Sequence, residues 1–183
     1  IELLNSQVDR CNEILKRLTL NPVEEDEFID KDINIRDYLN EIILSFKEIS
    51  KKEFVFNFDQ DSNPKKISKS IEIVYGLRNF IGNANKFSSN KIFITLKTDM
   101  NITEITIEDD GKGFPNDIIS KIGEPYLKSL KEKNKNKIGL GLGMFIGKTL
   151  LEKNFATVNC SNSQTRGGAE IIITWRNKDL FKI

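Results

Sequence analysis

The stretch KIFITLKTDMNITEITIEDDGKG, residues 91–113, contains two runs in which apolar and polar side chains alternate, followed by two glycines. Such alternation is typical of strands with one buried face. We therefore predict strands at 91–98 and 102–109. The short polar segment Asp99-Met100-Asn101 predicts that the two strands are joined as a hairpin.

The second of these strands ends in a carboxylate. Asp109 has the same parity as the isoleucines of that strand, so it should continue the row that faces the core, whereas Asp110 points the other way. A carboxylate at the edge of an apolar pocket can accept a hydrogen bond from an exocyclic amine such as that of adenine. Gly111 and Gly113 permit a close approach that a Cβ would block. Taken alone, the segment is better described as a plain Asp-Gly turn.

The flanking sequence mixes helix and strand patterns. The predicted helices lie at 35–49, 67–87, 116–122 and about 141–153, and the remaining strands at 54–58, 155–160 and 169–175. This order of elements predicts an α+β fold, in which a mixed sheet is covered by helices on one face to form a two-layer α/β sandwich.

The first 20 residues repeat apolar side chains at spacings of three and four. The residues of this heptad seam are Ile1, Leu4, Val8, Cys11, Leu15 and Leu18. One such helix cannot bury its own stripe, so it needs partner helices from upstream sequence or from a second subunit. Residues 21–34, which include Pro22 and several acidic side chains, are interpreted as a linker, and the mixed domain then spans 35–183. Because the sequence begins at Ile1 and not at methionine, we expect further sequence upstream.

Composition excludes several function classes. The 183 residues are 38% hydrophobic and 30% charged with a net charge of +1, which is typical of a globular protein and argues against a nucleic-acid binder. No run of 18 apolar residues is present, and two cysteines are too few for a disulfide scaffold. The sequence contains no histidine, which excludes Ser-His-Asp and Cys-His catalysis within this chain and argues against a transition-metal site.

A polar stripe lies on the predicted helix at 67–87. Asn79 and Asn83 are four residues apart and Lys86 follows three later, so all three share one helix face. An amide oxygen is a suitable ligand for Mg²⁺, which usually shares phosphate oxygens and keeps several waters, and Lys86 would add positive charge near phosphates. Ordinary helix surface is the alternative, because the chain is rich in asparagine and lysine throughout.

A third polar segment, Gly139-Leu-Gly141-Leu-Gly143, opens the predicted helix at about 141–153. Bare amides at a helix N-terminus form a site for anions, phosphate above all. Five lysines precede the glycines and could close over a triphosphate: Lys128, Lys131, Lys133, Lys135 and Lys137. A solvated loop is the alternative for these lysines, and a weak nucleic-acid patch is another, although no interleaved aromatic residues support it.

The three polar segments, in this order, resemble the ATP-binding domain of sensor histidine kinases. These kinases belong to the GHKL superfamily, which also holds gyrase, the mismatch-repair ATPase and heat-shock chaperones. The resemblance covers about 35–175, where the segments at 79–86, 109–113 and 139–143 look like the N, G1 and G2 boxes. The sequence looks most like the redox-responding RegB/PrrB type in three segments: Ser6–Cys11, Gly123–Tyr126 and Gly143–Leu151.

The resemblance implies a role for each matching residue. Asn83 would bind Mg²⁺, Asn79 would assist near the phosphates, and Asp109 would recognise the adenine amine. The implied nucleotide-binding residues are Asn79, Asn83, Lys86, Asp109, Gly111, Gly113, Lys137, Gly139, Gly141 and Gly143. Residues 1–20 would be the second helix of a dimerisation and histidine-phosphotransfer hairpin, in which Cys11 is the candidate redox switch; the alternative is that Cys11 is a small apolar residue of the heptad seam.

The resemblance also implies the reaction: transfer of the γ-phosphoryl group of ATP, with Mg²⁺, to a histidine absent from this chain, and from there to a response regulator. It further implies a homodimer formed through residues 1–20 and the missing helix, no nucleic-acid partner, and a cytoplasmic domain of a kinase that can be anchored in the inner membrane. The alternatives are a GHKL-type ATPase, an anti-sigma-type serine kinase and a non-catalytic nucleotide-binding scaffold. ATP hydrolysis is disfavoured because gyrase-type relatives carry a glutamate four positions before the Mg²⁺-binding asparagine, where this chain has Asn79, which cannot act as a base.

Overall fold

The structure, a computed structural model, describes residues 33–58, 65–67, 70–125 and 142–180. The predicted heptad helix with Cys11, and the predicted linker up to Asp32, lie outside the described residues.

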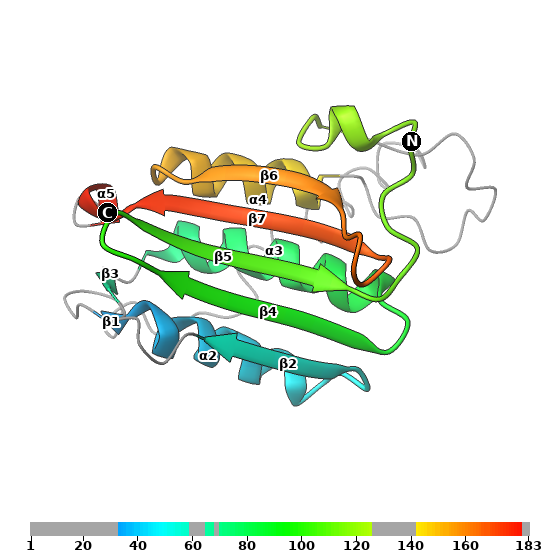
Figure 1. The fold of residues 1–183 in the computed structure, drawn as a ribbon, viewed down its shortest axis with the longest axis horizontal. Helices are drawn as coiled ribbons and strands as arrows, with labels where there is room; N and C mark the ends of the chain where they lie inside the picture. Colours follow the sequence, from blue (N-terminus) through cyan, green and yellow to red (C-terminus); the bar gives the residue numbers. More distant parts are fainter. Residues whose placement is uncertain (1–32, 59–64, 68–69, 126–141, 181–183) are drawn as a thin grey trace, which may run out of the picture. The chain divides into compact units, whose positions relative to one another are not determined.

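Most of the described chain forms a five-stranded sheet with helices on one face, as Figure 1 shows. The strand order is β2 (Glu53–Phe58), β4 (Lys91–Thr98), β5 (Ile102–Asp109), β7 (Ala169–Arg176) and β6 (Thr157–Asn162). Strand β2 is parallel to β4, and the other neighbours are antiparallel. The predicted α+β sandwich with a mixed sheet is therefore confirmed.

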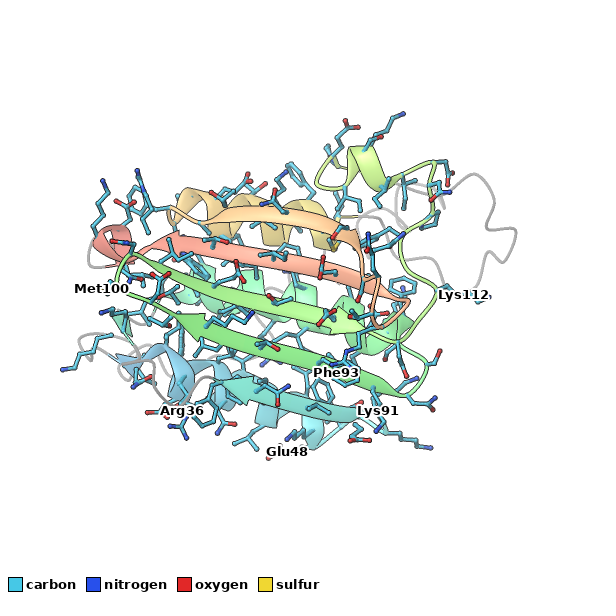
Figure 2. All side chains as sticks on the ribbon, in the orientation of Figure 1. Arg36, Glu48, Lys91, Phe93, Met100 and Lys112 are labelled. Carbon is cyan, nitrogen blue, oxygen red and sulfur yellow. The ribbon has the colours of Figure 1, made fainter. Side chains whose placement is uncertain are left out.

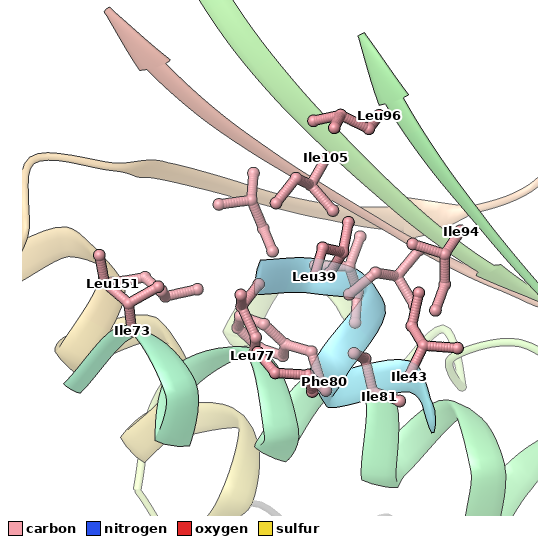
Figure 3. Close-up of a cluster of buried hydrophobic side chains, with 14 of the residues drawn as sticks. Leu39, Ile43, Ile73, Leu77, Phe80, Ile81, Ile94, Leu96, Ile105 and Leu151 are labelled. Atoms are coloured by element: carbon pink, nitrogen blue, oxygen red, sulfur yellow. The ribbon is translucent and has the colours of Figure 1, made fainter. Parts of the chain in front are cut away.

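Three helices cover that face: α2 (Ile35–Lys47), α3 (Ile71–Phe87) and α4 (Gly143–Lys153). Their apolar stripes pack on the inward rows of the sheet, as the close-up in Figure 3 shows. Fully buried side chains in this cluster include Leu39, Ile43, Leu77, Phe80, Ile94, Ile105 and Leu151. The two-residue strands β1 (Ile33–Asn34) and β3 (Lys66–Ile67), the 3₁₀ turn η2 (Ile119–Lys121) and the last short helix α5 (Asn177–Leu180) complete the described elements.

The central hairpin has the predicted bounds. Strands β4 and β5 span 91–98 and 102–109, and the Asp99 carboxylate closes the turn by accepting hydrogen bonds from the amides of Asn101 and Ile102 at 2.6 and 2.7 Å. Side-chain acceptors of this kind stabilise tight turns in place of backbone groups. Local alternation was therefore sufficient to predict both strands.

Several predicted boundaries were wrong. Helix α2 ends at Lys47 and not at 49, and strand β6 ends at Asn162 and not at 160. Helix α3 begins at Ile71 and not at 67, because Lys66 and Ile67 pair with β1 instead. Strand β6 begins at Thr157 and not at 155, because Phe155 adopts a left-handed φ of 63° and its amide bonds back to Glu152 as helix α4 ends. The helix predicted at 116–122 is one 3₁₀ turn.

Helices α3 and α4 cross where each carries a glycine. A Cβ on Gly76 would lie 2.6 Å from Cγ of the buried Leu151, and a Cβ on Gly147 would lie 3.2 Å from the Gly76 carbonyl oxygen. The glycines thus let the two helices approach closely, which brings the first turn of α4 against α3.

The two ends of the sheet differ in character. In Figure 2, Met100 marks the end at the β4–β5 hairpin, and Lys112 marks the opposite end. There β5 leads into residues 111–114, called the glycine loop below. Met100 is 89% exposed. The predicted site segment at 109–113 lies at the Lys112 end. Among the described residues, no helix combines the length and apolar character needed to cross a bilayer.

Candidate functional site

Asp109, the last residue of β5, is a buried carboxylate at the edge of the core. It is only 3% exposed, which confirms the inward parity predicted from the sequence. Its Oδ1 accepts hydrogen bonds from the amides of Gly111 at 2.8 Å and Ala169 at 3.3 Å. Burial raises the pKa of Asp109, although the two amides oppose that shift. A buried carboxylate in this environment gains by meeting a hydrogen-bond donor.

Two glycines make room for this carboxylate. A Cβ on Gly168 would lie 2.1 Å from the Asp109 carbonyl oxygen, and a Cβ on Gly111 would lie 2.3 Å from the carbonyl oxygen of Phe87. No side chain fits at either place, since real Cβ contacts are longer. The sequence prediction included Gly111 and missed Gly168; the signal that could have indicated it is the doublet Gly167-Gly168 just before the last strand.

The turn after α3 is tied to the end of β5 by Asp110 and to the segment just before β2 by Lys52. The Asp110 carboxylate accepts hydrogen bonds from the amides of Ser89 and Asn90 at 2.8 and 2.9 Å, and the Lys52 ammonium donates to the Ser88 carbonyl at 2.8 Å. Desolvation raises the pKa of Asp110, but the backbone amides together outweigh it, so that pKa is lowered. Asp110 therefore points away from the core as predicted, and it anchors the C-terminal end of α3 beside Asp109.

The predicted asparagine pair on α3 meets the start of α4. A Cβ on Gly143 would lie 3.3 Å from Oδ1 of Asn79 and 3.6 Å from Nδ2 of Asn83. Asn79 donates through Nδ2 to the Tyr75 carbonyl at 2.8 Å, which orients its amide with the oxygen directed toward Gly143. The N-terminal turn of α4, with its free amides, therefore lies directly beside both asparagines.

Asn83 has an unsatisfied amide. Its Nδ2 is buried and has no hydrogen-bond partner among the described residues. An unpaired buried polar group costs free energy unless a ligand supplies its partner. Rotating the Asn83 carboxamide by a half-turn about its Cβ–Cγ bond exchanges Nδ2 for Oδ1, so the side-chain oxygen can occupy the same place. The side chain thus fits the predicted Mg²⁺ role, because a neutral amide oxygen beside a helix N-terminus suits a cation that also binds phosphate.

The remaining predicted residues are less closely grouped. Lys86 is exposed and its Nζ lies 5.0 Å from the ring centroid of Phe87, which is itself 55% exposed. Gly113 has a φ of +71°, and a Cβ there would lie 2.6 Å from Oδ1 of Asn162, a residue that the sequence prediction missed. Lys137, Gly139, Gly141 and the other lid lysines lie outside the described residues.

Helix α3 joins the two clusters. Asn79 and Asn83 contact Gly143 on α4, and Phe87, one turn after Asn83, contacts Gly111 beside Asp109. A carboxylate, an amide pair and a helix N-terminus are therefore held along one helix edge. This is the arrangement needed to hold a base at one end and phosphates at the other.

Comparison with known proteins identifies the family of this chain. The family described as "Histidine kinase-, DNA gyrase B-, and HSP90-like ATPase" matches residues 68–179. Two sequences of sensor histidine kinase RegB from Cereibacter sphaeroides are 30% and 28% identical to this chain over 170 residues. Each alignment covers 88% of this chain and 36% of the RegB sequence, so the chain spans about a third of those relatives. The similarity to the RegB type expected from the sequence is confirmed.

Solved structures show the same fold. The mycobacterial sensor histidine kinase MprB superposes with a TM-score of 0.67 at 18% identity, covering 80% of this chain and 97% of that one. The nucleotide-free catalytic domain of histidine kinase ThkA gives 0.64 at 18% identity, covering 80% and 96%. Full-length ShkA in complex with AMPPNP gives 0.63 at 20% identity, covering 79% of this chain and 30% of ShkA.

Proposed function

Because the chain belongs to the histidine kinase-, DNA gyrase B- and HSP90-like ATPase family, we propose that it is the ATP-binding catalytic core of a two-component sensor histidine kinase. The observation that carries the proposal is the grouping of Asp109, Asn83 and Gly143 along α3. Similarity to RegB over most of this chain supports the kinase assignment, and a kinase of the same fold has been solved with the ATP analogue AMPPNP.

Asp109 would recognise the adenine base. Both hydrogen bonds that its carboxylate accepts from described residues reach Oδ1, so Oδ2 is the natural acceptor for the exocyclic amine of adenine. A guanine, which carries a carbonyl oxygen at that position, would place an acceptor against the buried carboxylate and be rejected. Gly111 would let the base lie close to the backbone.

The phosphates would lie at the other end of the site. Asn83 would hold Mg²⁺ through its side-chain oxygen, Asn79 would assist, and the free amides at the start of α4 would bind phosphate oxygens. When bound, Mg²⁺ supplies neutralisation of the phosphate charge. In the same proposal, Lys86, Lys137, Gly113, Gly139 and Gly141 border the nucleotide.

The proposed reaction is transfer of the γ-phosphoryl group to a histidine, and then to a response regulator. The sequence has no histidine, so the acceptor must come from another polypeptide segment, placed in line with the phosphate by docking. Positioning and charge stabilisation are most of what such a transfer requires. Hydrolysis is disfavoured, because Asn79 takes the place of a general base and its amide donates to the Tyr75 carbonyl.

Calorimetric titration with ADP and Mg²⁺ tests this site. We expect the wild-type chain to bind ADP, and Asn83→Ala and Asp109→Asn each to weaken binding at least tenfold. In Asp109→Asn the amide oxygen can keep both backbone donors, which turns the NH₂ group toward the adenine amine, donor against donor. Asn57→Ala, on the exposed side of β2, is the matched control and should bind as the wild type does. Unchanged affinity in both site variants would refute the site.

We also propose that the kinase is a homodimer formed through residues 1–20 and the acceptor helix, with Cys11 as its redox switch and the domain on the cytoplasmic side of a membrane-anchored protein. Peroxide would oxidise two Cys11 thiols of a dimer to one disulfide. A non-reducing gel should then show a crosslinked dimer that Cys11→Ser removes. Cys160 is a poor competitor, since burial raises the pKa of its thiol to about 11. A crosslink that persists in Cys11→Ser would overturn the assignment.

A further inference from the structure

The side chain of Asn162 pairs with the backbone of the glycine loop as a neighbouring strand would. Its Oδ1 accepts a hydrogen bond from the Phe114 amide at 2.6 Å, and its Nδ2 donates to the Phe114 carbonyl at 3.0 Å. Both polar groups of that peptide position are therefore satisfied by one side chain 48 residues away in the sequence. Each such hydrogen bond contributes modestly to the free energy of folding. Removing the Asn162 side chain, however, would leave the partly buried backbone groups of Phe114 unpaired.

The fit around this pairing is close. Gly113 adopts a left-handed φ of +71°, and a Cβ on it would lie 2.6 Å from Asn162 Oδ1. The loop can therefore approach the asparagine only because glycine precedes Phe114. Phe114 itself packs against the hydrophobic core, so the loop is held by its side chain on one side and by Asn162 on the other.

The same asparagine is linked to the adenine-recognising carboxylate. Asn162 is the last residue of β6 and pairs in register with Ala169 of β7. The Ala169 amide donates to Asp109 Oδ1, and Gly168 is in contact with the Asp109 backbone. One strand pair therefore determines both the position of the loop that follows Asp109 and the orientation of Asp109 itself.

We propose that Asn162 is a positioning residue for the nucleotide base: it holds the 111–114 loop in the base-binding conformation before any ligand arrives. Preorganisation of this kind increases affinity because the ligand does not have to order the loop on binding. The inference rests on the proposed function, since it presumes that Gly111 and Gly113 border a bound base.

The test uses the full chain, ADP with Mg²⁺ as the probe, and the variant Asn162→Ala. We expect its Kd for ADP to rise about tenfold and the Phe114 amide to lose its protection against hydrogen exchange. The GDP-to-ADP ratio of Kd values should also fall, since a loosened loop discriminates less between bases. Asn159→Ala, exposed on the same strand β6, is the control and should change none of these quantities.

A second, milder variant keeps the test valid if Asn162→Ala fails to fold. Asn162→Asp keeps an acceptor for the Phe114 amide and loses the donor, so its Kd for ADP should lie between those of the wild type and Asn162→Ala. Wild-type ADP affinity and base ratio in Asn162→Ala, despite lost Phe114 protection, would overturn the inference while leaving the proposed function intact. A wild-type chain that binds no ADP would overturn both.

Discussion

Asp109 combines two demands that usually conflict: it must be buried to complete the core edge, and it must stay ionised to accept a hydrogen bond from a ligand. Burial raises its pKa, and the amides of Gly111 and Ala169 limit that rise. The free protein therefore holds a carboxylate whose charged form is under-solvated. A donor from a bound base would relieve that deficit.

This conflict predicts a pH dependence for the free protein. Because the folded pKa of Asp109 is raised, the native state binds more protons than the unfolded state between the two pKa values. The contribution of Asp109 to the unfolding free energy is thus fully present below its pKa in the unfolded chain, and it is lost as the pH rises through its pKa in the folded chain. In urea titrations from pH 3.5 to pH 7, the unfolding free energy of Asp109→Asn relative to the wild type should increase with pH. A difference that is constant over this range would contradict the raised pKa.

At the scale of elements, the crossing of α3 and α4 determines whether the asparagines reach the start of α4. Gly76 and Gly147 set the distance between these helices, and Leu151 fills the space beside them with no exposed surface. Cores of this density respond to a single added methyl group. The glycines at the crossing therefore serve the site indirectly.

The two glycines of α3 predict opposite effects of the same substitution. Gly76→Ala should lower the unfolding free energy by about 1–3 kcal/mol, because the new methyl group would overlap the buried Leu151 and outweigh the better helix propensity of alanine. Gly82→Ala should raise it by about 0.5–1 kcal/mol, since a Cβ there would meet only the Phe46 ring at 3.8 Å. Denaturant unfolding measures both, and equal effects would show that packing at the crossing is not tight.

At the scale of the whole molecule, the described site belongs to one unit of the chain, Asp32–Ile183. Its described residues come from α3, β5 and the loop that follows it, the start of α4, Gly168 and the start of β7, and the end of β6. The predicted domain boundary near residue 35 stays a proposal. If the boundary is right, nucleotide binding does not require residues 1–32.

A chain of residues 33–183 should therefore bind ADP within about twofold of the full-length affinity. By mass action, ADP at a hundred times its Kd should stabilise both chains by about 2.7 kcal/mol, measured as the nucleotide-dependent change in unfolding free energy. Asn83→Ala in the shorter chain, with a Kd at least tenfold higher, should be stabilised by no more than about 1.4 kcal/mol at the same ADP concentration. A shorter chain that folds without binding ADP would place part of the site in residues 1–32.

The sequence by itself was sufficient wherever the signal was local. Alternation predicted β4 and β5 to the residue, parity predicted that Asp109 faces inward, and apolar spacing predicted the helices that cover the sheet. It failed at boundaries decided by distant partners: Ile67, where the predicted helix at 67–87 begins, belongs to strand β3 because β1 pairs with it.

Only the tertiary structure decided which polar groups meet. Asn162 against Phe114, Gly168 against Asp109 and Asn79 against Gly143 are contacts between segments far apart in sequence. Such contacts depend on strand register and on the distance between two packed helices, and no single residue or spacing encodes either quantity. For that reason the sequence predicted the residue types of a nucleotide site, whereas the groups that hold its loop and its carboxylate became evident only from the folded chain.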